Sequence, residues 1–135
     1  MTEQYPNRES LLEMAESFMG ACVLGAAAEL DLFTLLARQP ATAEQVTIRI
    51  DGDRRCTEIL LDAAVSLNLL DKADGLYRTP EPLQPWLVED AEETLLPMIR
   101  HRMNVLRGWV QLPWMAKAGV PFPRQLSIRG ILADR

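Results

Sequence analysis

The sequence has little histidine and cysteine, two side chains on which many catalytic and metal sites depend. It has one histidine, His101, and two cysteines, Cys22 and Cys56, among 135 residues. A histidine-based metal cluster or a Ser/His/Asp triad therefore cannot be completed within one chain. The seven glycines include no G-x-G, the pattern of loops that hold a nucleoside or dinucleotide. We expect no catalytic, cofactor-binding or metal-binding residue here, and we expect His101 to be a solvated or interface histidine.

Positive charge is also scarce, because 14 Lys and Arg are outnumbered by 19 Asp and Glu, for a net charge of -5. Nucleic-acid binding depends on neutralising phosphates, so this balance disfavours a nucleic-acid partner. The N-terminus has no basic region followed by an apolar core, and no apolar run approaches about 18 residues. The sequence thus indicates a cytoplasmic protein that does not span a membrane. Cys22 and Cys56 occupy apolar helical positions and are predicted to be buried, reduced thiols.

What the sequence does have is a globular composition with helical periodicity. Apolar residues make up 48% and charged residues 24%, which predicts one folded domain. Ser10 and Glu13 have capping-box spacing and predict the start of a first helix, which we expect to break near Gly20. Asp31 is placed to cap a short helix over residues 32–37. The apolar positions of the first helix are Leu11, Ala15, Phe18, Cys22, Ala26 and Leu30.

The middle of the chain predicts a helix-turn-helix followed by a β-hairpin. Thr42 and Gln45 form a second capping box, Asp53 is an N-cap, and Asn68 is suited to end the second helix with positive φ. Asp74-Gly75 then predicts a hairpin turn. This order of elements is that of a winged helix. The apolar stripe expected on the second helix contains Cys56, Ile59, Leu60, Ala63, Ala64 and Leu67.

The last third of the chain predicts an irregular, proline-rich segment and then a long helix. Pro80, Pro82 and Pro85 indicate irregular structure until Thr94, which could cap the helix, and Pro113 is expected to kink or end that helix one turn early. Residues 120–135 have helical spacing at their end but no cap. We read this stretch as a connector toward a missing domain.

The run over residues 18–33, which ends in Glu29-Leu30-Asp31-Leu32-Phe33, resembles the start of O-methyltransferases of the caffeic-acid type, with Asp31 in place of the usual Gly. The resemblance continues through residues 42–46, 53–55, 59–64 and 69–70. It then takes in the hairpin at 75–80, Trp109 and Leu112, and Gly119-Val120-Pro121-Phe122. It thus covers nearly the whole chain.

The resemblance implies a mostly α, winged-helix dimerisation domain over residues 1–119, with extra N- and C-terminal helices, and residues 120–135 as the connector. It implies an interlocked homodimer that pairs methyltransferase subunits and helps to wall the pocket for a small-molecule acceptor. S-adenosylmethionine and catalysis would belong to a second domain. By resemblance, and because Phe18, Met19, Val23 and Leu24 exceed what one core stripe needs, the expected dimer interface comprises Leu11, Phe18, Met19, Val23, Leu24, Leu106 and Val110.

The positions that the resemblance assigns to the acceptor pocket have a plainer interpretation as core or dimer packing; they are Ile99, Arg100, Met103 and Trp109. Two other functions stay open. A DNA-binding winged helix would use Arg54, Arg55, Lys72 and Arg78, although Glu58 and Asp62 place negative charge on the same face. The second open function is that of a dimeric scaffold that binds a small ligand between its helices.

Overall fold

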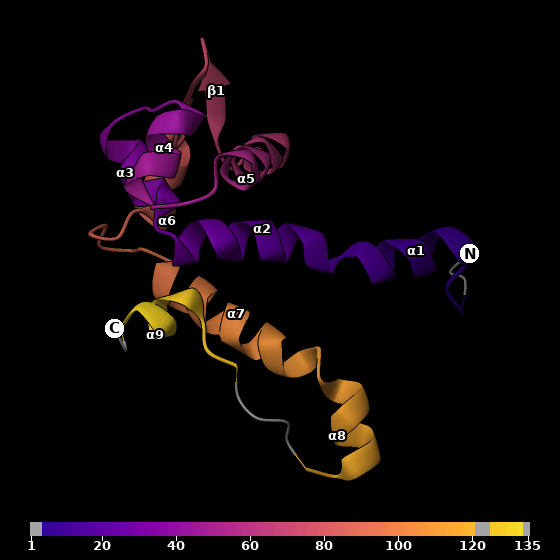
Figure 1. Ribbon diagram of the computed structural model, residues 1–135. Helices are drawn as coiled ribbons and strands as arrows, with labels where there is room; N and C mark the ends of the chain where they lie inside the picture. Colours follow the sequence, from indigo (N-terminus) through magenta and orange to yellow (C-terminus); the bar gives the residue numbers. More distant parts are fainter. Residues whose placement is uncertain (1–3, 121–124, 134–135) are drawn as a thin grey trace.

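The computed structural model describes residues 4–120 and 125–133. Helices dominate, and the one sheet in the described part of the chain is small, two-stranded and antiparallel (Figure 1). The mostly helical fold that the sequence predicted is therefore confirmed.

The first two helices, α1 (Arg8–Glu16) and α2 (Phe18–Glu29), form one long arm (Figure 1). The predicted capping box at Ser10 and Glu13 is wrong. Asn7 is the N-cap, and its side chain accepts the Ser10 N–H at 2.9 Å while the Ser10 hydroxyl accepts the Asn7 N–H at 2.8 Å. The helix therefore begins one turn earlier than expected, because Asn7 satisfies its free amides. The break lies at Ser17 rather than near Gly20.

Residues 8–29 taken together are long and apolar enough to cross a membrane by length and composition, with a mean hydropathy of 1.4 in the best window. This corrects the expectation that no such stretch exists. The last turns of α2 are nevertheless part of the protein core, since Gly25, Ala27, Ala28 and Glu29 are buried.

α3 (Leu32–Arg38) and α5 (Arg54–Ser66) pack against α2, and α4 (Ala43–Arg49) packs against α5. The capping box of Thr42 with Gln45 is confirmed, and so is the Asp53 cap, which accepts the Cys56 N–H at 2.9 Å. The fully buried side chains include Leu32, Phe33, Leu36, Val46, Leu61, Leu70, Tyr77 and Leu96. These side chains come from α3, α4, α5, the hairpin region and α7, so one core joins all of them.

The apolar stripe predicted on α5 is partly wrong. Thr57, Leu61 and Ala64 are buried, whereas Cys56 and Ile59 are exposed. Leu67 is exposed as well, and Cys22 is only half-buried. Because α5 has apolar residues on two sides, periodicity alone could not tell which side meets α2 and α4.

The hairpin consists of β1 (Asp71–Ala73) and β2 (Leu76–Arg78), which pair antiparallel with Lys72 opposite Tyr77. Positive φ angles at Asp74 (53°) and Gly75 (75°) confirm the predicted turn, and Asn68 ends the preceding helical segment with φ of 61°. Tyr77 is buried and also pairs with Ala41 before α4, so the hairpin is attached to the helical core.

The proline-rich segment is irregular as predicted only over residues 88–95. Its first part forms a 3-10 turn, η1 (Glu81–Leu83), and a short helix, α6 (Gln84–Leu87), because proline is tolerated in the first turn of a helix. Leu87 is buried against the core.

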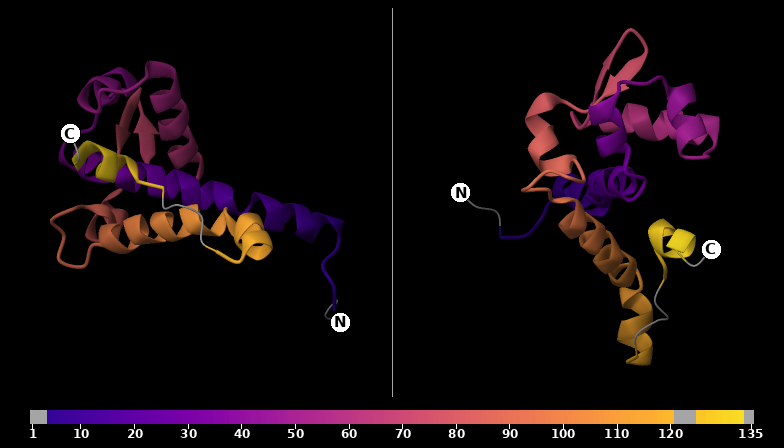
Figure 2. Two further views of the ribbon diagram at one scale, coloured as in Figure 1. Left: turned by 60° about the horizontal axis from the view of Figure 1, so that its bottom comes forward. Right: turned by 90° about the vertical axis from the view of Figure 1, so that its left-hand side faces the viewer.

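The second long arm is α7 (Leu96–Trp109) followed by α8 (Leu112–Ala118), and α9 (Ile128–Ala133) returns toward the end of α2 (Figure 2). Leu95, and not Thr94, is the N-cap of α7, although the Thr94 hydroxyl accepts the Leu96 N–H at 3.3 Å. The expected effect of Pro113 is confirmed, because α7 ends at Trp109, four residues earlier, where a proline ring would collide with the helix carbonyl.

Candidate dimer interface

The two arms α1–α2 and α7–α8 form a V (Figure 1). They pack together where the second half of α2 crosses α7 and separate toward α1 and α8. None of the nine residues of α1 is buried. One chain alone therefore leaves both arms largely open to solvent.

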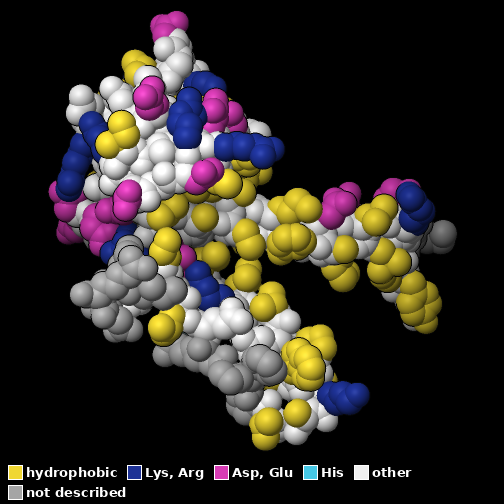
Figure 3. Space-filling view, viewed as in Figure 1, with side chains coloured by type: hydrophobic (Ala, Val, Ile, Leu, Met, Phe, Trp, Pro, Cys, Tyr) yellow, Lys and Arg dark blue, Asp and Glu magenta, His cyan; other side chains and the backbone are white. Residues whose placement is uncertain are grey.

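Apolar side chains are exposed along both arms (Figure 3). On the first arm, Leu11, Phe18 and Met19 have 52%, 52% and 53% of their surface exposed. On the second arm, Trp109 and Val110 are each 67% exposed. Other large exposed side chains on the arms are Leu12, Met14, Met98, Val105, Leu112, Trp114 and Met115. Such an extended apolar surface is typical of a protein–protein contact.

The arms meet in a three-point contact on one face of α7. Met103 packs against Gly25 of α2, where a Cβ would overlap the methionine side chain. One turn earlier, Arg100 donates from Nε to the Ala28 carbonyl at 3.1 Å. One turn later, Arg107 reaches the carboxylate of Glu29, with Nη2 at 2.7 and 2.8 Å from its two oxygens.

Both arginines of this contact are engaged in ion pairs. The Glu29 side chain is 6% exposed, so its charge depends on Arg107 for compensation. Arg100 also binds both oxygens of Glu89, at 3.2 and 2.8 Å, and lies 3.6 Å from Asp31. The hydrogen bond from Arg100 is the main reason why the pKa of Glu89 lies below its ordinary value. The vertex of the V is therefore fixed by both packing and charge.

A family model described as the O-methyltransferase dimerisation domain matches residues 12–83. The chain belongs to this dimerisation-domain family. The match begins in α1 and ends in η1, so it contains most of the first arm, helices α3 to α5 and the hairpin, and it does not reach α6 or the second arm.

Relatives and solved structures agree with this assignment. The N,N-dimethyltransferase OxyT of Streptomyces rimosus is 41% identical over 103 residues, which are 73% of this chain and 30% of OxyT. The structure of PigF with SAH has a TM-score of 0.74 at 29% identity and covers 84% of this chain and 34% of PigF. Human N-acetylserotonin methyltransferase in complex with SAM has a TM-score of 0.70 at 29% identity, covering 90% and 40%. The dimerisation domain thus spans less than half the length of each.

The predicted interface residues of the dimerisation domain lie on the two arms. Leu11, Phe18, Met19 and Val110 are exposed. Val23, Leu24 and Leu106 are half-buried, and the first two pack against the core. The assignment of these residues to a dimer interface stays a prediction.

The four positions predicted to line an acceptor pocket all lie on α7. Ile99 is partly buried against the core, Met103 packs on Gly25, and Trp109 is exposed. Arg100 has its guanidinium committed to Glu89, Asp31 and the Ala28 carbonyl. A direct contact between Arg100 and an acceptor would therefore require these bonds to be exchanged. His101 is exposed on the same helix.

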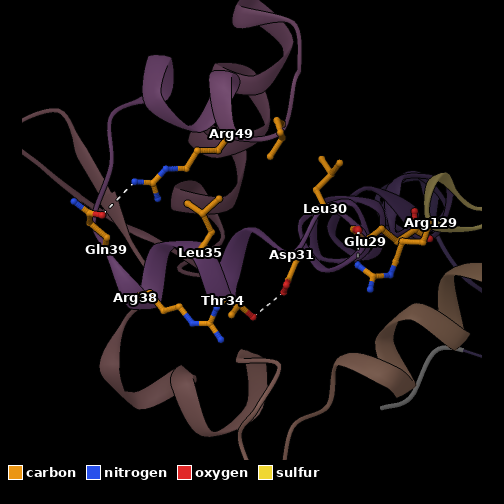
Figure 4. Close-up of a pocket in the computed structure, with 10 residues that line it drawn as sticks. Glu29, Leu30, Asp31, Thr34, Leu35, Arg38, Gln39, Arg49 and Arg129 are labelled. Atoms are coloured by element: carbon orange, nitrogen blue, oxygen red, sulfur yellow. Dashed lines mark hydrogen bonds between the residues drawn. The ribbon is translucent and has the colours of Figure 1, made fainter. Parts of the chain in front are cut away.

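A hollow of about 1040 Å³ lies between the α2–α3 corner, α4 and α9, and sequence reasoning did not find it (Figure 4). Its wall includes Leu30, Leu35 and Arg38, with the Arg49 side chain donating to Gln39 Oε1 at 3.2 Å. The hollow combines residues from segments up to 100 positions apart, so no local motif could have indicated it. Within the described residues no group of three or more His, Cys, Asp or Glu side chains could hold a metal ion.

The basic residues considered for DNA binding are partly neutralised. Arg54 pairs with Glu58 at 2.6 Å, and Lys72 pairs with Asp62 at 3.2 Å. Arg55 and Arg78 are exposed. Paired cations release fewer counterions from a phosphate backbone, so the DNA-binding alternative is not favoured.

Proposed function

We propose that this dimerisation domain pairs two subunits of a SAM-dependent methyltransferase by interlocking the V-shaped arms of two copies. The first arm of one copy would enter the opening between the arms of the other, and the reverse contact would follow from the two-fold symmetry. The single observation that carries the proposal is the exposed apolar surface on both arms. A second copy is the occupant that a dimerisation domain implies.

We also propose that α4, α5 and the hairpin are a winged helix that serves here as a protein scaffold. The order of these elements and the attachment of the hairpin through Tyr77 support this. The net charge of this domain is -5, and the winged helix has too few exposed cations to act mainly as a DNA-binding domain.

In the parent protein we propose that the paired domains help to wall the acceptor pocket and exclude water, while S-adenosylmethionine and proton transfer belong to a separate catalytic part. The methylated atom is open, since one relative is named an N,N-dimethyltransferase and another an acetylserotonin O-methyltransferase. Ile99, Met103 and Trp109 are the residues of this chain that we propose to contribute to the wall.

The dimer is tested by sedimentation of the chain and of two matched variants. Met19→Glu places a charge in the proposed interface, and we expect it to weaken dimerisation by about 100-fold or more, because an unpaired buried charge is costly. Ile48→Glu is the control, because Ile48 is 73% exposed on α4, outside both arms. We expect its dimer affinity to stay within about threefold of the unchanged chain. A chain that stays strictly monomeric at high concentration would contradict the proposal.

A further inference from the structure

The contact at the vertex of the V joins three side chains of one helix face to three neighbouring positions of α2. Arg100, Met103 and Arg107 follow each other at intervals of three and four residues, which places them on the same face of α7. Their partners in α2 are the Ala28 carbonyl, Gly25 and the Glu29 carboxylate. The two arginines thus lie on either side of an apolar contact.

An apolar contact alone would leave the angle between two helices loosely defined. Met103 is a flexible side chain and can repack at little cost. Arg107 is held at two points, because its Nη2 contacts both oxygens of the almost fully enclosed Glu29 carboxylate and its Nη1 donates to Asn104 Oδ1 at 3.0 Å. Arg100, one turn before Met103 on α7, donates to the Ala28 carbonyl, so both arginines bind the last turn of α2 from separate positions on α7. The Arg100 guanidinium also binds Glu89, which precedes α7 in the chain, and lies 3.6 Å from Asp31, which follows α2.

The angle between the arms matters because a small rotation at the vertex moves the far end of a long arm by several ångströms. Gly25 lies 17 positions after Arg8 in the first arm, which corresponds to roughly 26 Å of helix. A tilt of about 10° at the vertex would therefore move the tip of α1 by roughly 4–5 Å, close to the pitch of one helical turn. Such a shift would misplace the exposed side chains of α1 relative to a second copy.

We propose that Arg100 and Arg107 are positioning residues that set the opening of the V, so that the two arms fit a second copy of the chain. This inference rests on the proposed dimer. Buried ion pairs contribute little to stability compared with apolar residues of similar size. We therefore assign to the buried Glu29–Arg107 pair the role of defining the angle between α2 and α7.

The test replaces both members of the buried pair with apolar side chains. We expect Glu29→Met combined with Arg107→Met to keep the melting temperature within about 3 °C of the unchanged chain or above it. We expect the same variant to weaken dimerisation by about tenfold or more, because the arms are no longer held at one angle. Arg102→Met is the matched control: Arg102 is an exposed arginine of the same helix for which the described residues provide no ion pair, and its dimer affinity should change less than about threefold.

A distance within one chain measures the geometry directly. Spin labels at Glu13→Cys on α1 and Lys117→Cys on α8, with Cys22 and Cys56 replaced by alanine, report the opening of the V when labelled chains are diluted with unlabelled ones. We expect a narrow distribution for the unchanged pair and a shifted or broader one for the double methionine variant. An unchanged distribution, or dimer affinity within threefold of the unchanged chain, would overturn the inference.

Two further outcomes separate the possible failures. If the chain is monomeric but the double methionine variant still changes the label distance, the proposed dimer is wrong and the positioning role stands. If the double methionine variant does not fold, the exchanged pair Glu29→Arg with Arg107→Glu is measured against Arg107→Met alone. Recovery of dimer affinity by the exchange supports the inference, and no recovery overturns it.

Discussion

Among single residues, Gly25 has the most direct structural reason for its identity. It lies in the middle of α2, where an added Cβ would overlap the Met103 side chain. We expect Gly25→Ala to leave the free energy of unfolding within about 1 kcal/mol of the unchanged chain, because the flexible Met103 side chain must repack and the cost of this overpacking offsets the gain of about 1 kcal/mol in helix propensity. Denaturant unfolding, at concentrations below those at which the chain dimerises, measures this change.

Gly20 provides the matched control on the same helix. Nothing lies within 4 Å of a Cβ built at Gly20, so Gly20→Ala should gain helix propensity without a clash and raise stability by up to about 1 kcal/mol. If both substitutions stabilise the chain equally, the close approach of α7 at Gly25 does not constrain the fold.

Single residues also show where local reasoning succeeds. Asn68 and Asp74 adopt the positive φ angles that their types and positions predicted. Asp31 has a positive φ of 55° as well, although it was expected only as a helix cap, and its side chain accepts from the Thr34 hydroxyl at 2.7 Å rather than capping the helix. The residue type was the available signal, because Asp and Asn adopt this conformation more readily than other residues with a side chain.

At the scale of elements, two side chains of the hairpin make polar contacts with one carboxylate of α5. The Tyr77 hydroxyl donates to the Asp62 carboxylate, and Lys72 lies 3.2 Å from the same carboxylate and over the Tyr77 ring. The hydrogen bond from Tyr77 is the main reason why the pKa of Asp62 lies below its ordinary value of 3.8. A lowered folded-state pKa stabilises the protein above the unfolded pKa, and this contribution is lost as the pH falls through the folded pKa.

We therefore expect Tyr77→Phe to cost about 1 kcal/mol at neutral pH and to lose less stability than the unchanged chain when the pH falls below about 4. Tyr5→Phe is the control, since Tyr5 is 74% exposed, and it should leave both quantities unchanged. Denaturant unfolding between about pH 7 and pH 2.5 measures both effects. An identical acid dependence in Tyr77→Phe and the unchanged chain would show that the hydrogen bond does not stabilise the Asp62 carboxylate.

Elements were predictable where a local motif had no competitor. The Thr42–Gln45 box, the Asp53 cap and the hairpin turn are such cases. The first helix had two overlapping boxes, and the one formed by Asn7 and Ser10 is used. The buried side of α5 depended on where α2 and α4 lie, so tertiary packing decided it and the local pattern could not.

At the scale of the whole molecule, the arms could be recognised from the sequence only as a surplus of apolar residues. The V itself depends on contacts between residues far apart, such as Arg107 with Glu29, 78 positions away. Arginine and glutamate are usually solvated, so nothing in their local sequence marked them as the pair that joins the arms. The sequence thus predicted which residues form the candidate interface, whereas their arrangement in space could be seen only in the structure.

The chemistry of the arms predicts how the dimer should respond to temperature and salt. Because the exposed side chains of the proposed interface are apolar, association should show a negative heat-capacity change in calorimetric dilution at several temperatures. Its dissociation constant should vary less than about threefold between 0.1 and 0.5 M salt, since screening acts on exposed charges and not on apolar burial. A weakening of tenfold or more over the same range would mean that the charged sides of α1 and α7 hold the subunits together. The apolar surfaces of the two arms would then need another occupant.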